Sequence, residues 1–373
     1  DDPERFRTPP ENSQLLEDFE DVVLKITEVK AIYPRYRVLP AAWRQHFWQI
    51  AVRIDTDSGV SGWGYGGGGV AAVDVVNLHL RELLVGRTLG SIEDIADLWD
   101  AQYQATLPYG RSGIAVMAIS GVDLALWDVL GRAEGQRVCD LLGGQRRNTV
   151  RAYATGPDYS WYRDLGFDAH KSSQTRQASP EADTERILEW ADAARQGLGD
   201  GALLMIDAYM SWTPEFALIL TRLLSQHNIY WFEDVLLPDD LDGLAALRPQ
   251  IQPVLLAGGE HEFTARDFTH IARAQALDLW QPDITWCGGL TAVLRIAELA
   301  QQYNVPLVPH RGGEIWGLHF LAAGYGEDLA EKVMGKREAK RDILWNGEPA
   351  SQDGRMVLPE GPGFGVEINE ELL

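Results

Sequence analysis

Three absences limit what this 373-residue chain can be. It has only two cysteines, Cys139 and Cys287, too few for a disulfide framework and in keeping with a reducing cytoplasm. It has no apolar run of about 18 residues or more, and its opening residues do not read as a signal peptide, so we expect no membrane partner. It also lacks basic charge, since the formal net charge of −22 argues against a nucleic-acid partner.

What is present is typical of a globular protein. The composition is 45% hydrophobic and 24% charged, and a chain of this length is expected to form two domains rather than one small core. The negative charge does not exclude small anionic ligands, because a bound metal ion can reverse the sign of the local field.

The first domain is expected to be α+β and to span residues 1–147. Residues 22–65 alternate in the manner of a β-meander, and residues 71–142 are helical in pattern. The run YGGGG at 65–69 is interpreted as a flexible or closely packed loop, not a regular element. It is not a dinucleotide site, because the strand, GxGxxG turn and helix of such a site are missing.

From about residue 149 short apolar runs alternate with longer amphipathic ones. Strand then helix, repeated about eight times over 148–338, predicts an α/β fold of the (β/α)8 barrel type. The expected strands are VRAYATG, GFDAHKS, ALLMIDAY, IYWFEDV, PVLLAGGE, LDLWQPD, VPLVPH and a weak eighth at EKVMG. The segment 339–373 has no helical pattern and is expected to pack back on the first domain.

Three consecutive predicted strands end on acids, Asp207, Glu233 and Glu260, with gaps of 26 and 27 residues. Parallel neighbouring strands would bring these carboxylates together, and their repulsion would be severe without a cation between them. Three oxygen donors suit Mg²⁺ better than Zn²⁺. The alternative, that each acid pairs with an arginine or caps a helix, holds for a single acid better than for three in succession.

The next two strands end on Asp283 and His310, 27 residues apart. A carboxylate beside an imidazole orients the ring and raises its basicity, so His310 is a candidate general base. His261 directly follows Glu260 and is a candidate substrate contact. For each of the remaining histidines in loops or on helices, a structural role is preferred, although His46 also lies in the loop 33–46, a candidate for substrate binding.

The chain resembles the enolase superfamily, in its mandelate racemase-like subgroup. Within that subgroup it is similar to the acid-sugar dehydratases of the L-rhamnonate type. The motifs that carry the resemblance are GVDLALWDVLG, YATG, MIDAYMS, QPDITWCGGLT, VPH and PGFGVE. The resemblance implies a barrel whose mouth is covered by an N-terminal capping domain, completed by the C-terminal segment.

The same resemblance implies roles for the strand-end residues. Asp207, Glu233 and Glu260 match the Mg²⁺ ligands of the family, and Asp283 with His310 matches its His–Asp dyad. These matches agree with the roles that the residue types and their spacing suggest.

Strands two and eight supply further matches. Lys171 falls where the family has the first lysine of a Lys-x-Lys pair, and Ser173 stands in place of the second lysine. Lys171 is interpreted as either catalytic or structural. The acid of strand eight that helps to hold the enolate is matched by Glu331, with Glu327 as the alternative.

The missing second lysine favours dehydration over racemisation. Racemisation needs a base on each face of the substrate, whereas elimination of water needs one, and His310 supplies it. We therefore expect α-proton abstraction through an enediolate to a 2-keto-3-deoxy acid. A racemase or epimerase would need His170 as its second base, and a non-catalytic relative that binds a metabolite is a third alternative.

Substrate choice is expected to depend on the loop 33–46 of the capping domain, whose arginines and aromatic residues suit a sugar acid. The candidate contacts are Arg35, Tyr36, Arg44 and His46. The resemblance further implies a homo-oligomer.

Overall fold

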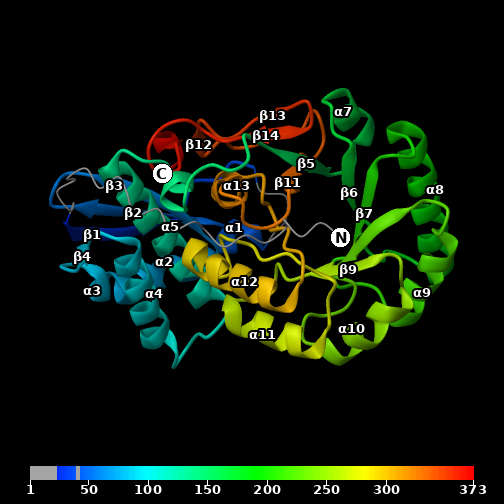
Figure 1. Ribbon diagram of the computed structural model, residues 1–373, viewed down its shortest axis with the longest axis horizontal. Helices are drawn as coiled ribbons and strands as arrows, with labels where there is room; N and C mark the ends of the chain where they lie inside the picture. Colours follow the sequence, from blue (N-terminus) through cyan, green and yellow to red (C-terminus); the bar gives the residue numbers. More distant parts are fainter. Residues whose placement is uncertain (1–22, 39–42) are drawn as a thin grey trace.

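The computed structural model describes residues 23–38 and 43–373 and has two parts. In Figure 1 the blue and cyan elements of the first part lie beside the green and yellow elements of the second. The first part is an antiparallel sheet with helices, and the second is a parallel barrel. The predicted α/β architecture of a capping domain and a barrel is confirmed.

The predicted meander is an antiparallel sheet in the order β3-β2-β1-β4. Along β1 buried and exposed residues alternate, because one face of the strand packs on the core. β4 pairs with β1 and interrupts a region that was expected to be helical. The strands are β1 (Leu24–Ile32), β2 (Ile50–Thr56), β3 (Ser61–Gly66) and β4 (Thr88–Leu89).

Helices cover this sheet, and α5 is the most buried of them. It is long and apolar enough to cross a membrane by length and composition, but it is enclosed by β3, α4 and α12 and is therefore a core helix. The helices of this part are α1 (Arg44–Phe47), α2 (Gly69–Val75), the π-helix η1 (Val76–Leu80), α3 (Arg81–Leu84), α4 (Ile92–Thr106), α5 (Ile114–Glu134) and α6 (Val138–Leu141).

Glycines on β3 allow α5 to approach the sheet closely. A Cβ atom on Gly64 would lie 2.0 Å from the carbonyl oxygen of Gly121 in α5. The expectation of a loop at 65–69 is wrong at both ends of that run, because Gly66 ends β3 and Gly69 begins α2. The close packing expected there is present, since a Cβ on Gly67 would lie 2.8 Å from the indole of Trp286.

The barrel is closed by β11 (Ala330–Val333), which pairs in parallel with β5. The seventh predicted strand is present only as two bridges, Trp280 with Leu307 and Asp283 with His310. The other strands are β5 (Thr149–Thr155), β6 (Ala169–Ser173), β7 (Leu203–Asp207), β8 (Ile229–Glu233), β9 (Leu255–Gly258) and β10 (Leu279–Trp280).

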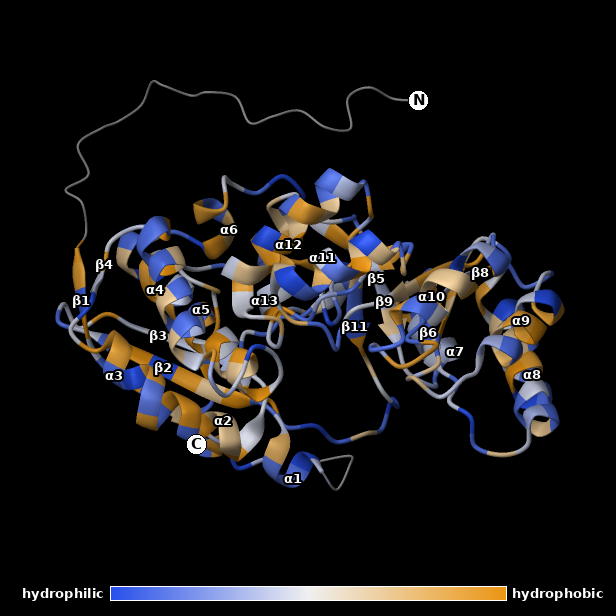
Figure 2. Cartoon of the chain, turned by 90° about the horizontal axis from the view of Figure 1, so that it is seen from below, coloured by the Kyte–Doolittle hydropathy of each residue, from blue (hydrophilic) through white to orange (hydrophobic). Residues whose placement is uncertain are grey.

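Side chains that point into the barrel form a small apolar cluster in its interior, which includes Tyr153, Met205 and Trp231. Figure 2 shows hydrophobic and hydrophilic residues together on the outer helices α8 and α9, as expected for helices with one face on the barrel. The outer helices are α7 (Tyr159–Asp164), α8 (Pro180–Leu198), α9 (Pro214–Leu223), α10 (Leu241–Leu247), the 3₁₀ helix η2 (Arg248–Gln250), α11 (Thr264–Ala274), α12 (Gly289–Tyr303) and α13 (Ile315–Ala322).

The C-terminal segment contacts both parts of the molecule. β14 pairs antiparallel with β5 of the barrel, while Asp128 of the capping helix α5 accepts a 2.9 Å hydrogen bond from the backbone N–H of Phe364. The short elements of this segment are β12 (Trp345–Asn346), β13 (Ser351–Gln352), β14 (Arg355–Val357), β15 (Glu367–Ile368) and the 3₁₀ helix η3 (Glu370–Leu372).

The contact between β3 and α5 generates a stability prediction. We expect Gly64→Ala to lower the free energy of unfolding by about 3 kcal/mol or more, because the new methyl group must displace the backbone of α5. Gly201→Ala is the matched control, since a Cβ there meets no atom within 4 Å, and its effect should stay within about 0.5 kcal/mol. Chemical denaturation followed by circular dichroism measures both; equal stability of the two variants would contradict the prediction.

Candidate active site

The three acids predicted as metal ligands lie at one end of the barrel. Asp207 is the last residue of β7 and Glu233 the last residue of β8, and the two are register partners. Glu260 follows the end of β9 by two residues. The C-terminal ends of parallel barrel strands meet at the same face, which is where barrel enzymes carry their active sites.

Burial and neighbouring negative charge raise the pKa of Asp207 and of Glu233. Burial and the charge of Glu233 raise the pKa of Asp207 to about 7. Burial also raises the pKa of Glu233, and although Lys171 opposes this, the charges of Glu331 and Glu260 add to it. Repulsion of this kind is relieved by a cation, and a set of carboxylate oxygens suits Mg²⁺. The chemistry of the donor set therefore fits the ion that was predicted.

Each predicted ligand also contacts a protein partner. Glu233 accepts hydrogen bonds from Trp231 Nε1 at 3.0 Å and Gln281 Nε2 at 2.7 Å, and it is ion-paired with Lys171. In the described part of the chain, the group of donor atoms lying within 4.8 Å of one another is Asp234, Glu260 and His261. Glu260 is common to this group and to the predicted one, so the assignment of all three predicted ligands stays a prediction.

The predicted dyad is formed. His310 Nδ1 lies 2.8 Å from Asp283 Oδ2, which holds the imidazole with Nδ1 protonated and directs Nε2 toward the acids. His310 Nε2 lies 3.1 Å from Glu260 Oε2. Burial alone would lower the pKa of His310, but Glu260 and the hydrogen bond with Asp283 raise it to about 10.

Lys171 of β6 and Glu331 of β11, the two strands on either side of β5, form a buried ion pair. Lys171 Nζ lies 2.9 Å from Glu331 Oε1, and both side chains are almost fully buried. Burial raises the pKa of Glu331, but Lys171 and His310 outweigh it and lower that pKa to about 2. Glu327, the alternative for this position, is exposed, so the structure places Glu331 in the site.

The positions of His170 and Ser173 on β6 show whether this strand offers a second base to the site. Residues alternate across a strand, so Lys171 points into the barrel and His170 points out of it. His170 is fully buried, its Nε2 is 2.8 Å from the carbonyl oxygen of Gly156, and burial lowers its pKa to about 4. Its ring packs near Trp190 of α8, outside the barrel. Ser173 is the register partner of Asp207, at the mouth.

This geometry agrees with two family matches. The N-terminal domain of the mandelate racemase / muconate lactonizing enzyme family matches residues 30–143, and the enolase C-terminal domain-like family matches residues 159–372, more than half of the chain. The chain belongs to the enolase superfamily. Its mandelate racemase-like N-terminal domain also places it in the subgroup expected from its motifs.

Relatives within the superfamily match nearly the whole chain. A protein of Caldivirga maquilingensis, provisionally named L-rhamnonate dehydratase, is 36% identical over 352 residues, which are 92% of this chain and 87% of the relative. The L-rhamnonate dehydratase of Saccharopolyspora erythraea is 33% identical over 356 residues, covering 92% and 89%. The crystal structure of rhamnonate dehydratase from Gibberella zeae complexed with Mg has a TM-score of 0.84 at 27% identity, covering 94% of this chain and 95% of that one.

The capping domain of this superfamily member reaches the barrel mouth through Arg44 and Trp48. The Arg44 guanidinium lies 3.9 Å from the centroid of Trp48. Burial and the nearby charge of Arg311 lower the pKa of Arg44, whereas Tyr209 and Glu260 act to raise it. Arg44 is therefore close enough to Glu260 and Arg311 to interact electrostatically with the site. Of the predicted substrate contacts from the loop, Arg44 is the one that the electrostatics connect to the acids.

The other predicted substrate contacts differ in whether they border the acids. The Tyr36 hydroxyl bonds within the capping domain, to the carbonyl oxygen of Gln49 and the hydroxyl of Tyr65, both at 3.1 Å. Arg35 and His46 are exposed. His261 lies 3.3 Å from Glu260 and stacks on Trp286, so it borders the site. Residues 39–42 of the loop lie outside the described residues.

Sequence reasoning missed three residues around the dyad: Gln49, Thr285 and Arg311. Thr285 stands two residues after Asp283, where an Asp-x-Thr turn could have indicated a hydrogen bond to the carboxylate. Arg311 directly follows His310, has a positive φ of 54° and donates two hydrogen bonds to Glu314, at 3.0 and 2.6 Å. Nothing local in the sequence connects Gln49 with the dyad.

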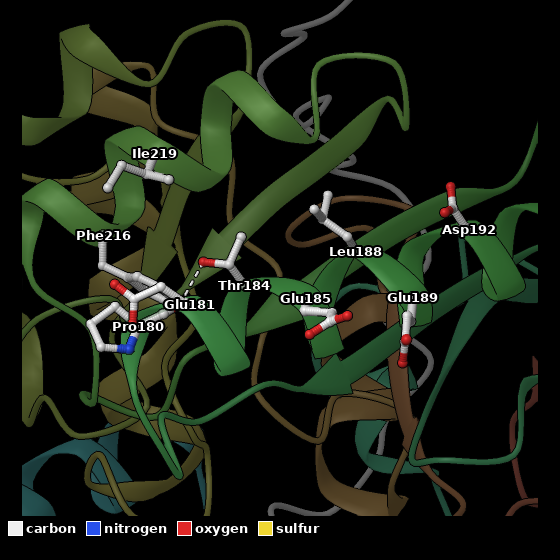
Figure 3. Close-up of a pocket in the computed structure, with 9 residues that line it drawn as sticks. All are labelled: Pro180, Glu181, Thr184, Glu185, Leu188, Glu189, Asp192, Phe216 and Ile219. Atoms are coloured by element: carbon white, nitrogen blue, oxygen red, sulfur yellow. Dashed lines mark hydrogen bonds between the residues drawn. The ribbon is translucent and has the colours of Figure 1, made fainter.

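A groove on the outside of the barrel is separate from this site. Figure 3 shows it between α8 and α9, with carboxylates along one side and Phe216 and Ile219 on the other. Its lining residues all belong to these two helices, and none lies at a strand end. The groove therefore takes no part in the chemistry of the barrel mouth.

The acid cluster generates a prediction about metal binding. We expect Asp207→Asn to weaken Mg²⁺ binding at least about tenfold, measured by isothermal titration calorimetry, because one anionic donor is lost. The variant should stay folded, since the substitution removes a carboxylate whose charge burial opposes. Glu327→Gln is the control at an exposed acid and should bind Mg²⁺ like the wild type. Equal affinities in the two variants would remove Asp207 from the ligand set.

Proposed function

We propose that this protein is a Mg²⁺-dependent dehydratase that converts a sugar acid of the L-rhamnonate type into a 2-keto-3-deoxy acid. The observation that carries the proposal is the single histidine base. His310 Nε2 is directed toward the acid cluster, Ser173 occupies the position of a second lysine base, and His170 points out of the barrel. The names of the two curated relatives support the substrate class.

His310 acts first and must be neutral to accept a proton. Mg²⁺ held by Glu260 would offset the carboxylate charge that raises the pKa of His310. His310 Nε2 takes the proton from C2 of the substrate, and the electrons of the broken C–H bond pass into the carboxylate to form an enediolate. Asp283 stabilises the imidazolium through its 2.8 Å hydrogen bond to Nδ1. When bound by Asp207, Glu233 and Glu260, Mg²⁺ would supply positive charge to the substrate carboxylate and so acidify the C2 proton.

Elimination completes the reaction. The C3–O bond breaks, and the departing hydroxyl takes the proton from His310 and leaves as water. His310 is then neutral again. The resulting enol loses its O–H proton to solvent and takes a proton from solvent at C3, which gives the 2-keto-3-deoxy acid with no oxidant or reductant. One histidine thus serves both proton transfers.

Lys171 and Glu331 form the charged side of the site opposite Glu260. Lys171 is held between Glu233 and Glu331 and, because these carboxylates outweigh the effect of burial, its pKa is raised, so it is a fixed positive charge rather than a base. Glu331 lies 3.8 Å from His310 Nε2. We propose that Lys171 stabilises the negative charge of the enediolate and that Glu331 positions Lys171.

A racemase or epimerase is the rival within the same fold. It requires a second base on the opposite face of C2, and His170 is hydrogen-bonded outside the barrel instead. Incubation with substrate in D₂O separates the two reactions. Racemisation would place deuterium at C2 without loss of water, whereas dehydration releases water and leaves a keto group at C2.

We further propose that the enzyme works in the cytoplasm. Both cysteines are free and buried, in keeping with a reducing compartment. Arg44, at the barrel mouth, is the capping-domain residue proposed to bind the hydroxyls of the sugar acid. Size-exclusion chromatography with light scattering would test the expected homo-oligomer.

A panel of aldonic acids with Mg²⁺, assayed for 2-keto-3-deoxy products, tests the function. We expect activity on L-rhamnonate or a near stereoisomer, and a fall of about 10²–10⁴-fold in kcat for His310→Asn. His270→Asn, at an exposed histidine on α11, is the matched control and should keep wild-type activity. Dehydratase activity in folded His310→Asn within a few-fold of the wild type would overturn the proposal.

A further inference from the structure

We propose that Gln49 of the capping domain is a positioning residue for the His310–Asp283 dyad and acts through Thr285 and Trp286. The inference rests on the proposed function, in which this dyad is the base. Gln49 lies immediately before β2, is fully buried, and belongs to the capping domain, while the other four residues belong to the barrel domain.

The contacts form one unbroken chain. Gln49 Nε2 donates to Thr285 Oγ1 at 2.9 Å, and Thr285 Oγ1 donates to Asp283 Oδ1 at 2.6 Å. The backbone N–H of Thr285 donates to the same oxygen at 2.7 Å. Asp283 Oδ2 in turn holds His310 Nδ1 at 2.8 Å. Each oxygen of the dyad carboxylate is therefore directed at a different partner.

The donor and the acceptor of each hydrogen bond follow from the chemistry of the two groups. An ionised carboxylate only accepts hydrogen bonds, so the single hydroxyl proton of Thr285 goes to Asp283, and Thr285 Oγ1 is left to accept from Gln49. An indole N–H only donates, so the 2.8 Å contact of Trp286 Nε1 identifies the facing Gln49 atom as Oε1. The two neighbours thus require one orientation of the Gln49 amide, and a glutamate could not satisfy both.

Both branches lead to the same imidazole. One branch passes through Thr285 and Asp283 to Nδ1 of His310. In the other, Gln49 holds the indole of Trp286, whose ring centroid is 5.8 Å from that of His310. Trp286 is also confined by the capping domain at Gly67, where a Cβ atom would lie 2.8 Å from the indole.

The backbone of Gln49 is anchored as well. Its carbonyl oxygen accepts from the Tyr36 hydroxyl at 3.1 Å, and β2 begins at the next residue. A rigid anchor at the capping domain and a polarised donor chain to the dyad together fix the rotation of the Asp283 carboxylate. Gln49 is remote from the reacting atoms, so its loss should act on the rate of proton transfer and not on substrate affinity.

Four variants of the full-length protein with Mg²⁺ test this. Thr285→Val and Gln49→Met, both close in shape to the native residues, should lower kcat about 10-fold or more with KM changed less than about twofold, as is usual when a residue that orients a catalytic ligand is lost. Thr285→Ser keeps the hydroxyl and should restore kcat to within about threefold. The double variant Gln49→Met/Thr285→Val should lose less kcat than the product of the two single losses, because the two residues share the branch through Asp283.

Gln102→Met is the matched control. Gln102 is also a fully buried glutamine of the capping domain, but its Nε2 donates to Leu98 within its own helix, so kcat should be unchanged. If Gln49→Met fails to fold, Gln49→Glu replaces it, because an ionised glutamate keeps the shape and the acceptor for Trp286 but cannot donate to Thr285. A folded Gln49→Met with wild-type kcat, or with a raised KM and unchanged kcat, overturns the proposal.

A readout that needs no substrate separates this proposal from the proposed function. The Nδ1 proton of His310, held by Asp283, should give a low-field proton NMR signal, assigned by its loss in His310→Asn. In Gln49→Met and Thr285→Val the signal should move or broaden, while in Gln102→Met it should not. Inactivity of the wild type on every sugar acid would count against the function, whereas an unchanged NMR signal in Gln49→Met would count against the role of Gln49.

Discussion

Repulsion between buried carboxylates at the C-terminal end of the barrel is the constraint on which the rest of the structure depends. In the described part of the chain, the acids there outnumber the basic side chains that contact them, Lys171, His261, His310 and Arg311. Each of these side chains contacts two or more carboxylates, and the remaining negative charge suits a divalent ion. The acids concerned are Asp207, Glu233, Asp234, Glu260, Asp283 and Glu331.

In the proposed mechanism the capping domain orients the base as well as covering the barrel mouth. Gln49 links it to the dyad through Thr285, and Arg44 brings positive charge into the field of Glu260. If Gln49 acts as proposed, docking of the capping domain on the barrel also orients the base. An enzyme built in this way can vary its substrate through the loop before β2 while the barrel keeps the proton chemistry.

Much of the fold and the centre of the site could be predicted because both depend on local pattern. Strand-end residues such as Asp207 and His310 are recognisable from a short apolar run and the barrel repeat. β4 could not be predicted, because two residues carry too little periodicity. Gln49 could not be connected with Asp283 because they are 234 residues apart in the numbering, and only the docking of two domains brings them together.

The contacts of Tyr36 and of Glu260 could not be predicted from the sequence either. The sequence marks Tyr36 as a polar aromatic residue in a loop, but whether its hydroxyl turns to a substrate or to Gln49 depends on packing across the sheet. Likewise the sequence places acids at strand ends, yet which of them share a neighbour such as His261 is decided by side-chain rotamers.

The pairing of β5 has a consequence for the order of folding during synthesis. β5 is the first strand of the barrel, but two of its partners, β11 and β14, lie near the C-terminus of the chain. A ribosome releasing the chain from its N-terminus would therefore present a capping sheet and an open, curved sheet with an unpaired edge at β5. Barrel closure must wait until nearly the whole chain has emerged, so the unpaired edge of β5 is the place where a chaperone would be needed most.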